Sequence, residues 1–522
     1  MKQHLTLVAF FLLLFAVALV FRLPNLGNRP MHADEAVQAA RFRELWLEGR
    51  YVYDPNEYHG PTLNYATLPI IWVENPPDFA QVTAAMLRLV PALFGAGLVW
   101  LFYLLHDGVG KPAALIAGLL TAISPAAVFY SRYYIHETLF VFFTLAVLAT
   151  AWRYLRTGRL TWCLAAGASL GLMQATKETS VLAYAAAVGA LLAVVVWNRV
   201  SPAHSESPFP RWARWHFALG CAATIVVAVT LYSSFFTNWH GPLDGLLTYV
   251  HWVRRAGGHS PQTQPWYYFL RILAFWRADD GTWWSEGLTL ALAATSLIAM
   301  VWRAGRHLPV GTNLNFARWV SCYTLLSIAA YSVIPYKTPW CLLSFHVGLV
   351  LLAGMGAVTL IQLAPHFLLK ATVVVVLLAA CGQLAWQSYQ TSFVHFADPE
   401  NPFVHSPTQA KITELVDMIE ELTQVAPEGR DVEIRVIWHD NYYWPLPWYL
   451  RGFQRVGYWN HVPDKAAAPI IISSPQVDEQ LYAQLERTHY APYYYGVRHN
   501  VLVQLWVRDD LWEAHLRRIG RL

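Results

Sequence analysis

Charged side chains are scarce in this chain of 522 residues, where Asp, Glu, Lys and Arg together make up 13%. A water-soluble globular domain has roughly twice that fraction. Hydrophobic residues supply 56% of the chain, and the mean hydropathy is +0.32. The net charge of +4 is too small to indicate a nucleic-acid partner. Composition therefore excludes a wholly soluble protein and predicts that much of the chain lies in lipid.

Cysteines are also few, and none forms a CxxC pair or has the spacing of a metal site. All of them fall in or beside apolar runs, so we interpret them as small core hydrophobes. The sequence has no HExxH motif, and its polar C-terminal part has no GxGxxG motif or P-loop. The cysteines are Cys163, Cys221, Cys322, Cys341 and Cys381.

Long apolar runs, by contrast, are abundant. A helix needs roughly 20 residues to cross the hydrocarbon core of a membrane. The first run, Leu5 to Phe21, follows Lys2 and lacks a small-residue cleavage site, so we interpret it as an uncleaved span rather than a signal peptide. Together with the first run, the other apolar runs predict eleven transmembrane helices. Because this number is odd, the two termini are expected on opposite sides of the membrane. The other runs lie near residues 84–105, 112–130, 138–155, 160–176, 180–197, 215–236, 286–302, 318–335, 341–363 and 370–386.

Basic residues in the short loops predict the orientation, because Lys and Arg favour the cytoplasmic side. They gather in alternate loops, which leaves the two long loops, 22–83 and 237–285, outside. We therefore expect a multi-pass protein of the cell (plasma) membrane with a cytoplasmic N-terminus and an extracytoplasmic C-terminal domain. The basic residues of the predicted inside loops are Lys111, Arg153, Arg156, Arg159, Arg199, Arg211, Arg214, Arg303, Arg306, Arg318 and Lys370.

Residues 391–522 have a different composition and follow the predicted membrane domain, residues 1–390. Polar helical stretches alternate there with short β-rich runs, a pattern that predicts a small α/β domain. The expected helices are Lys411 to Leu422 and Asp478 to Arg487, and the expected strands are Val432 to Trp438, Ile470 to Ser473 and Val501 to Val507. The fold class is thus a polytopic α-helical membrane protein with a C-terminal soluble α/β domain.

A cluster of ionisable residues, His32-Ala33-Asp34-Glu35, follows the first predicted span. It opens a helical stretch that runs to about Leu47. Acidic residues favour helix N-termini, so the pair Asp34 and Glu35 could be a simple cap. A functional reading is equally compatible with these residues at the membrane surface.

A second cluster, Tyr130 to Glu137, lies where the third predicted span ends and the fourth begins. A charge at bilayer depth costs roughly 2.5–3.5 kcal/mol, so ionisable groups there are usually paired or functional. Arg132 and Glu137 could pair with each other. Both clusters nevertheless lie on the predicted outer face and could share one cavity.

Three shorter motifs fall on the same face. Lys177 and Glu178, between the fifth and sixth spans, could be an ordinary turn pair. In the segment 335–340, two prolines stop the helices, and Lys337 could snorkel to the interface. His59, in His59-Gly60-Pro61, adds one imidazole in a turn.

Carboxylates and cations thus converge on the outer membrane boundary from four connections. A carboxylate can take the proton of an acceptor hydroxyl, and Lys or Arg can stabilise a departing phosphate. This combination indicates an enzyme. The converging residues are Asp34, Glu35, Glu137, Glu178, Arg132, Lys177 and Lys337.

At these residues the chain resembles GT-C-type glycosyltransferases of the protein O-mannosyltransferase and aminoarabinose-transferase superfamily. Within it, the branch of flippase-activity-associated proteins is the most similar. The resemblance covers the whole membrane region and, less specifically, the tail. The motifs that carry it are His32-Ala33-Asp34-Glu35, Ser131-Arg132-Tyr133 with Glu137, Thr176-Lys177-Glu178, Tyr336-Lys337-Thr338-Pro339-Trp340 and the segment 444–451.

The resemblance implies transfer of a sugar from a polyprenyl-phosphate donor to an acceptor on the outer face. By that analogy Asp34 matches the acidic base, with Glu35 beside it, and Glu137 matches the acid of the second loop. Arg132 matches a donor contact, and Lys177 and Lys337 match contacts of the lipid phosphate. We expect an inverting hexosyl or pentosyl transferase whose catalytic residues are Asp34, Glu35 and Glu137. The expected substrate-binding residues are His32, His59, Arg132, His136, Lys177, Glu178, Tyr336, Lys337 and Trp340.

The expected partners are the polyprenyl-phosphate-linked sugar, a lipid, glycan or protein acceptor, and membrane lipids. The cofactor is unknown: His32, Asp34, His136 and Glu137 could supply ligands to a divalent metal, but they have no fixed metal-site spacing. Two other functions stay open. The chain could be a lipid-linked-sugar flippase or its accessory protein, although the predicted spans carry little charge at mid-depth. It could also be a scaffold whose C-terminal domain binds a partner.

Overall fold

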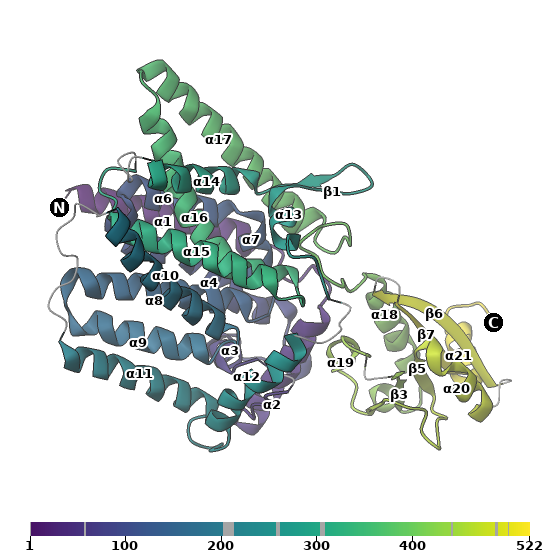
Figure 1. Ribbon diagram of the computed structural model, residues 1–522. Coiled ribbons are helices and arrows are strands. Elements are labelled where there is room, and N and C mark those ends of the chain that lie inside the picture. Colours follow the sequence, from purple (N-terminus) through teal and green to yellow (C-terminus); the bar gives the residue numbers. More distant parts are fainter. Residues whose placement is uncertain are drawn as a thin grey trace.

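The computed structural model places a helical bundle beside a small α/β unit at the C-terminus (Figure 1). Three of the basic residues that predict the orientation, Arg211, Arg303 and Arg306, lie outside the described residues. The structure describes residues 2–56, 59–201, 213–256, 262–302, 308–439, 442–485, 489–498 and 501–522.

Each of the eleven predicted apolar runs falls on a helix of the bundle. The last long helix, α17, is followed by a short π-helical turn, η4, at Gln390–Val394. The long helices are α1 (Lys2–Arg22), α4 (Ala84–Leu104), α6 (Lys111–Ile123), α8 (Glu137–Thr157), α9 (Leu160–Gln174), α10 (Ser180–Val200), α11 (Arg214–Tyr232), α14 (Gly287–Val301), α15 (Leu314–Val333), α16 (Leu343–Leu363) and α17 (Phe367–Tyr389).

Fewer of these helices satisfy the length and hydropathy expected of a full membrane crossing. Seven do so among the described residues, and an eighth crossing results if α6 and the short helix α7 (Pro125–Ser131), bent by 57° at Ser124, form one span. Helices α9 and α14 are apolar but shorter. The multi-pass membrane architecture is confirmed, whereas the count of eleven spans and the sidedness stay predictions.

Helix α16 forms the centre of the bundle and is buried along almost its whole length. It packs against α6, α8, α14 and α15. Two of its glycines permit this close approach: a Cβ atom would lie 2.3 Å from the Ala113 carbonyl oxygen at Gly354 and 1.8 Å from that of Leu292 at Gly356. Small residues that let helix backbones approach closely are typical of membrane helix packing.

The short helices that bear on the site lie at the end of the bundle nearest the C-terminal unit (Figure 1). The predicted helix after His32 is confirmed as α2. Short elements also include η1 (Phe79–Gln81), α5 (His106–Val109), β1 (Trp276–Arg277) and β2 (Trp283–Trp284). The elements that bear on the site are α2 (Ala33–Glu48), α3 (Thr62–Glu74), α12 (Gly241–Ala256), α13 (Tyr268–Ala274) and η3 (Pro339–Leu342).

The C-terminal unit contains a five-stranded sheet of order β4-β3-β5-β7-β6. Strand β3 pairs in parallel with β4 and β5, and β7 is antiparallel to β5 and β6. Alternate residues of the strands, such as Val436 and Ile472, meet α18 in one core. The elements are α18 (Lys411–Thr423), β3 (Ile434–Ile437), α19 (Leu446–Tyr449), β4 (Val456–Trp459), β5 (Ile470–Ser473), α20 (Asp478–Gln484), β6 (Tyr490–Arg498), β7 (Val501–Arg508) and α21 (Asp509–Arg518).

The predicted tail elements that fall on described residues are all present, but β4 and β6 were not predicted. Strand β4 has only four residues, and one of them is Gly457. Strand β6 contains Pro492 and Gly496, which are residues that usually interrupt a strand. Its place at the edge of the sheet explains the tolerance of proline there.

Candidate active site

Helix α2 begins with a capping box that fixes the first acidic pair. His32 is the N-cap, and its Nδ1 accepts a hydrogen bond from the Asp34 amide at 3.1 Å. The Glu35 carboxylate accepts one in return from the His32 amide at 3.0 Å. This arrangement satisfies backbone donors that a helix start otherwise leaves free. As a result, the adjacent Asp34 and Glu35 side chains enter different environments.

The Glu35 carboxylate is completely buried and is shared by two arginines. Arg88 donates from Nε to Oε1 and from Nη2 to Oε2, both at 2.7 Å, and Arg29 donates to Oε1 at 3.2 Å. The Tyr134 amide also donates to Oε1, at 2.8 Å. Burial alone would raise the pKa of Glu35, but Arg88 and Arg29 lower it to about 2. Glu35 therefore stays ionised and ties α2 to α4 and to the turn that contains Tyr134.

Asp34 has the opposite environment, with 53% of its side chain exposed. Its Oδ2 lies 3.9 Å from His32 Nδ1, which is a loose contact. Of the two acidic residues predicted as a pair, Asp34 is thus the one that a solvent-borne hydroxyl group can reach.

The acid of the second cluster, Glu137, pairs with Lys177 rather than with Arg132. The Lys177 ammonium donates to Glu137 Oε1, and both side chains are buried. Burial would lower the pKa of Lys177, but the carboxylate of Glu137 raises it above its usual range. The structure thus joins residues from two separate connections, the start of α8 and the turn between α9 and α10.

Glu178 pairs in the same way with a residue distant in sequence. Its Oε2 lies 2.9 Å from His59 Nδ1. Burial would raise the pKa of Glu178, but His59 lowers it. The His59 ring is 24% exposed, stacks on Trp252 of α12 at 5.5 Å and lies 5.1 Å from the His136 ring. His59 is therefore the part of this cluster that solvent reaches.

The backbone at Gly60 holds this cluster together. The Gly60 amide donates to the Thr176 carbonyl at 3.2 Å, and its carbonyl lies 2.9 Å from His136 Nε2. A Cβ atom at Gly60 would lie 2.1 Å from the Ala175 carbonyl oxygen, so only glycine fits. His136 is fully buried, and burial lowers its pKa well below the usual value. His136 is accordingly neutral beside Lys177.

Arg132 lies near the arginines that bind Glu35 and not near Lys177. Its guanidinium donates to the carbonyls of Arg22, at 2.9 Å, and Pro24, at 2.7 Å, and covers the Phe393 ring at 4.3 Å. The expected donor contact at Arg132 is therefore separate from the cluster around Lys177.

The last predicted motif approaches the site through Trp340. Its buried ring lies 6.0 Å from the His32 ring and 5.3 Å from His405, which precedes the C-terminal unit. Lys337 is buried, and its ammonium donates to the carbonyls of Ile334 and Gln264, the latter at 3.3 Å. Tyr336 is half-buried and forms a β-bridge with Thr263. Lys337 is thus held by backbone oxygens.

The C-terminal part of the chain directly contacts the two residues that precede α2. The Met31 amide donates to the Tyr449 hydroxyl of α19 at 2.8 Å, and the Met31 carbonyl accepts from the Thr408 hydroxyl at 2.8 Å. His32 Nε2 lies 2.9 Å from the His405 carbonyl oxygen. Atoms from the C-terminal part of the chain therefore fix the segment that carries Asp34.

Comparisons with known proteins bear on the family and the fold of this chain. Residues 57–239 match the family model of dolichyl-phosphate-mannose-protein mannosyltransferases. ArnT from Cupriavidus metallidurans bound to undecaprenyl phosphate is similar over 98% of this chain and 99% of that chain, with 15% identity and a TM-score of 0.63. The chain therefore shares its fold with ArnT, and its residues 57–239 match the mannosyltransferase family model.

Two further solved structures match this chain over different shares of its length. ArnT from the same organism in the apo state gives a TM-score of 0.62 at 15% identity, covering 98% of each chain. The protein O-mannosyltransferase Pmt1-Pmt2 complex from S. cerevisiae gives a TM-score of 0.32 at 17% identity, covering 48% of this chain and 34% of that chain. No curated protein matches the sequence. Placement in the flippase-associated branch of the superfamily stays a prediction.

The helical bundle contains functional candidates that the sequence analysis missed. Arg88 lies within an apolar run, where a lone charge is itself a signal of a paired or functional group. Arg29 and Trp252 gave no such signal. Among the described residues, no group of three or more His, Cys, Asp or Glu side chains is placed to hold a metal ion.

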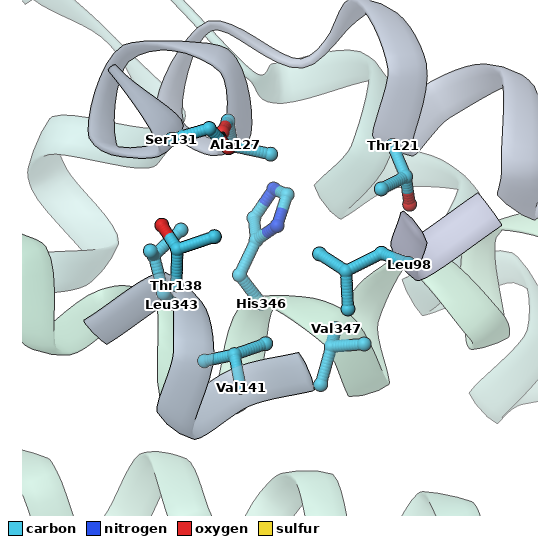
Figure 2. Close-up of a pocket in the computed structure, with 9 residues that line it drawn as sticks. All are labelled: Leu98, Thr121, Ala127, Ser131, Thr138, Val141, Leu343, His346 and Val347. Carbon is cyan, nitrogen blue, oxygen red and sulfur yellow. Dashed lines mark hydrogen bonds between the residues drawn. The ribbon is translucent and has the colours of Figure 1, made fainter. Parts of the chain in front are cut away.

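A buried contact between a carboxylate and an imidazole inside the helical bundle was missed as well. Glu286, at the start of α14, lies 2.8 Å from His346 Nε2 of α16. The same carboxylate accepts hydrogen bonds from the Ser124 hydroxyl at 2.7 Å and the Ala126 amide at 2.9 Å, where α6 bends into α7. The His346 ring points into a small cavity of about 20 Å³, which has room for roughly one water molecule (Figure 2). Its other lining residues are Leu98, Thr121, Ala127, Ser131, Thr138, Val141, Leu343 and Val347.

Proposed function

We propose that this chain is a GT-C glycosyltransferase that moves a sugar from a polyprenyl-phosphate donor to an acceptor hydroxyl on the extracytoplasmic face of the membrane. The observation that carries the proposal is the contrast between two adjacent carboxylates. Asp34 is half exposed, whereas Glu35 is buried and engaged by Arg29 and Arg88. A base must reach its substrate, and a positioning residue must be held fixed.

In the proposed reaction, Asp34 accepts the proton of the acceptor hydroxyl. The hydroxyl oxygen attacks the anomeric carbon of the donor sugar, and the bond from that carbon to the phosphate oxygen breaks. Polyprenyl phosphate leaves with the bond electrons, and the anomeric configuration is inverted. Glu35 positions Asp34 through the first turn of α2, where its carboxylate accepts the His32 amide.

Positive groups and hydrogen-bond donors near the donor stabilise the phosphate as its charge grows. We assign this role to His59, which solvent reaches, and to Lys177, which stays charged beside Glu137. Lys337 and Arg132 are held by backbone carbonyls, so we give them supporting roles in shaping the site. ArnT of C. metallidurans has been observed with undecaprenyl phosphate, which supports a lipid phosphate as the donor carrier.

The test uses Asp34→Asn and a matched control, Glu48→Gln, at the exposed end of the same helix. Purified protein in lipid nanodiscs would be given radiolabelled undecaprenyl-phosphate-linked hexoses or pentoses, with an envelope fraction of the native host as acceptor. We expect Asp34→Asn to lower transfer at least 100-fold, in the range of general base catalysis, and Glu48→Gln to leave it unchanged. Full transfer by Asp34→Asn would refute the assignment.

A flippase would behave differently in a second assay with the same lipids. Liposomes that contain the protein but no acceptor would show rapid movement of the labelled lipid between leaflets. Such movement without transfer in the matched assay would favour the flippase over the transferase.

A further inference from the structure

Four arginines lie buried together at the end of the bundle that carries α2. They are Arg22, at the end of α1, Arg29, Arg88 and Arg132. Within the described part of the chain, the ion pairs of this group all go to one carboxylate, that of Glu35, which contacts Arg29 and Arg88. The cluster therefore carries three more positive charges than negative ones.

Backbone carbonyls compensate this charge only in part. Arg22 donates to the carbonyls of Ala18, Thr121 and Ala122. Arg132 donates to three more carbonyls, at the end of α1 and in the segment that follows it. Carbonyl dipoles satisfy hydrogen bonds, but they do not neutralise a charge, and buried charges are ordinarily paired. Burial and the like charges of Arg29 and Arg88 lower the pKa of Arg132 to about 9.

A cavity of about 30 Å³ lies against three of these arginines. Two donors at this cavity, Arg29 Nε and Ser392 Oγ, are buried and have no hydrogen-bond partner among the described residues. Asn25 and Asn28 are exposed at its edge. The residues that matter for binding are Arg29, Arg88, Arg132, Ser392, Asn25 and Asn28.

We propose that this cavity binds the phosphate group of a ligand, either a lipid headgroup or free inorganic phosphate. Excess positive charge and two unused buried donors match the charge and the acceptor atoms of a phosphate. One water needs roughly 10–15 Å³ of such space, so the cavity admits about two phosphate oxygens while the rest of the group lies between Asn25 and Asn28. Asn25 and Asn28 follow directly after the apolar helix α1, at the depth where lipid headgroups begin.

This site is separate from the proposed donor site. Its lining residues include none of His59, Glu137, Lys177 and Glu178, which form the other cluster. Phosphate binding here does not require sugar transfer, so its test stands whether or not the transferase proposal holds. Arg29 and Arg88 also hold Glu35, so a bound phosphate would share its partners with the residue that positions Asp34.

The experiment measures the unfolding temperature of delipidated protein in neutral detergent as ligand is added. The probes are sodium phosphate and dioctanoyl phosphatidylglycerol. Sodium chloride at matched ionic strength controls for general anion effects, and dioctanoylglycerol controls for the acyl chains. A ligand that binds only the folded state raises the unfolding temperature in proportion to the logarithm of its concentration over Kd.

Two variants and their controls locate the binding. Ser392→Ala removes an unused donor, whereas Ser388→Ala removes a similarly buried and unpartnered hydroxyl one turn earlier that does not line the cavity. Asn28→Asp places a negative charge at the exposed edge, where folding is not at risk, and Asn460→Asp places the same charge on an exposed residue of the C-terminal unit.

We expect phosphate, phosphatidylglycerol or both to raise the unfolding temperature beyond chloride and dioctanoylglycerol. Ser392→Ala and Asn28→Asp should each weaken the apparent Kd roughly tenfold, and both controls should leave it unchanged. A response to phosphatidylglycerol alone would identify a lipid headgroup, and a response to both would show that free phosphate suffices. An equal response to chloride, or an unchanged Kd in Asn28→Asp, would overturn the proposal.

Discussion

Arg88 and Glu35 form a two-point ion pair in which both N–O distances are 2.7 Å. The pair is buried, so removal of Arg88 leaves the Glu35 carboxylate with only the longer contact to Arg29, away from water. We expect Arg88→Met to lower the free energy of unfolding by about 3–5 kcal/mol, which a large fall in the unfolding temperature in detergent would report. The double variant Arg88→Met with Glu35→Gln should lose less than the sum of the two single variants.

A surface pair on the same helix is the matched control. Arg41 and Glu44 are partly exposed and one turn apart. The same substitutions there, Arg41→Met and Glu44→Gln, should each cost under about 1 kcal/mol. Equal losses at the two pairs would contradict the structural role assigned to Glu35.

Because His405 is partly buried, we expect the folded protein to lose stability in mild acid. Burial lowers the pKa of His405 to about 4, and the nearby His32 acts in the same direction. The usual value is 6.5, so as pH falls the unfolded chain binds the proton first. The stability that His405 contributes is present above about pH 6.5 and is lost as pH falls to about 4, at about 1.4 kcal/mol per pH unit.

The measurement is the unfolding temperature of the wild type and His405→Asn at intervals from pH 7 to pH 4. The variant should show a shallower fall than the wild type. His461→Asn, at an exposed position, should follow the wild type. Parallel curves for all three proteins would show that His405 does not titrate in this window.

A larger residue at position 60 is expected to disturb the cluster around His59 by steric overlap. The substitution Gly60→Ala forces a methyl group to within 2.1 Å of the Ala175 carbonyl oxygen, so the backbone must move. We expect a loss of about 1–3 kcal/mol in unfolding free energy, measured by thermal unfolding. Gly382→Ala, in α17, has no atom within 4 Å of the new methyl group and should leave stability unchanged or slightly raised.

Loss of the Glu286 carboxylate inside the bundle is expected to lower the free energy of unfolding strongly. Glu286→Ala removes the acceptor shared by Ser124, Ala126 and His346, which leaves buried donors unpaired. We expect a loss of about 3–5 kcal/mol in unfolding free energy. Asp280→Ala, in the exposed loop before the same helix, should cost under about 0.5 kcal/mol. A small loss for Glu286→Ala would mean that water replaces the carboxylate.

The fold could be predicted largely from the length of the apolar runs. Each run became a helix, because a backbone in lipid must satisfy its own hydrogen bonds. Run length could not reveal the 57° bend at Ser124, because the side chain that anchors the bend, Glu286, comes from a distant helix. Strands β4 and β6 could not be predicted either, because pairing with their neighbours outweighs the glycines and proline that they contain.

The candidate site could be predicted as a set of residues but not as pairs. Local reasoning allowed Arg132 to pair with Glu137, and Lys177 with Glu178. The structure instead joins Lys177 to Glu137 and Glu178 to His59. Partners that are 40 and 119 residues apart are brought together by helix packing, which no local pattern encodes.

Met31 has both of its backbone groups held by the C-terminal part of the chain, through Tyr449 and Thr408. Any rotation of that part would therefore turn the first helical turn on which Asp34 sits. A molecule that bound the C-terminal unit in one orientation would alter the affinity of the membrane site for its substrate. By thermodynamic reciprocity, an occupied membrane site would alter the affinity of the C-terminal unit by the same factor.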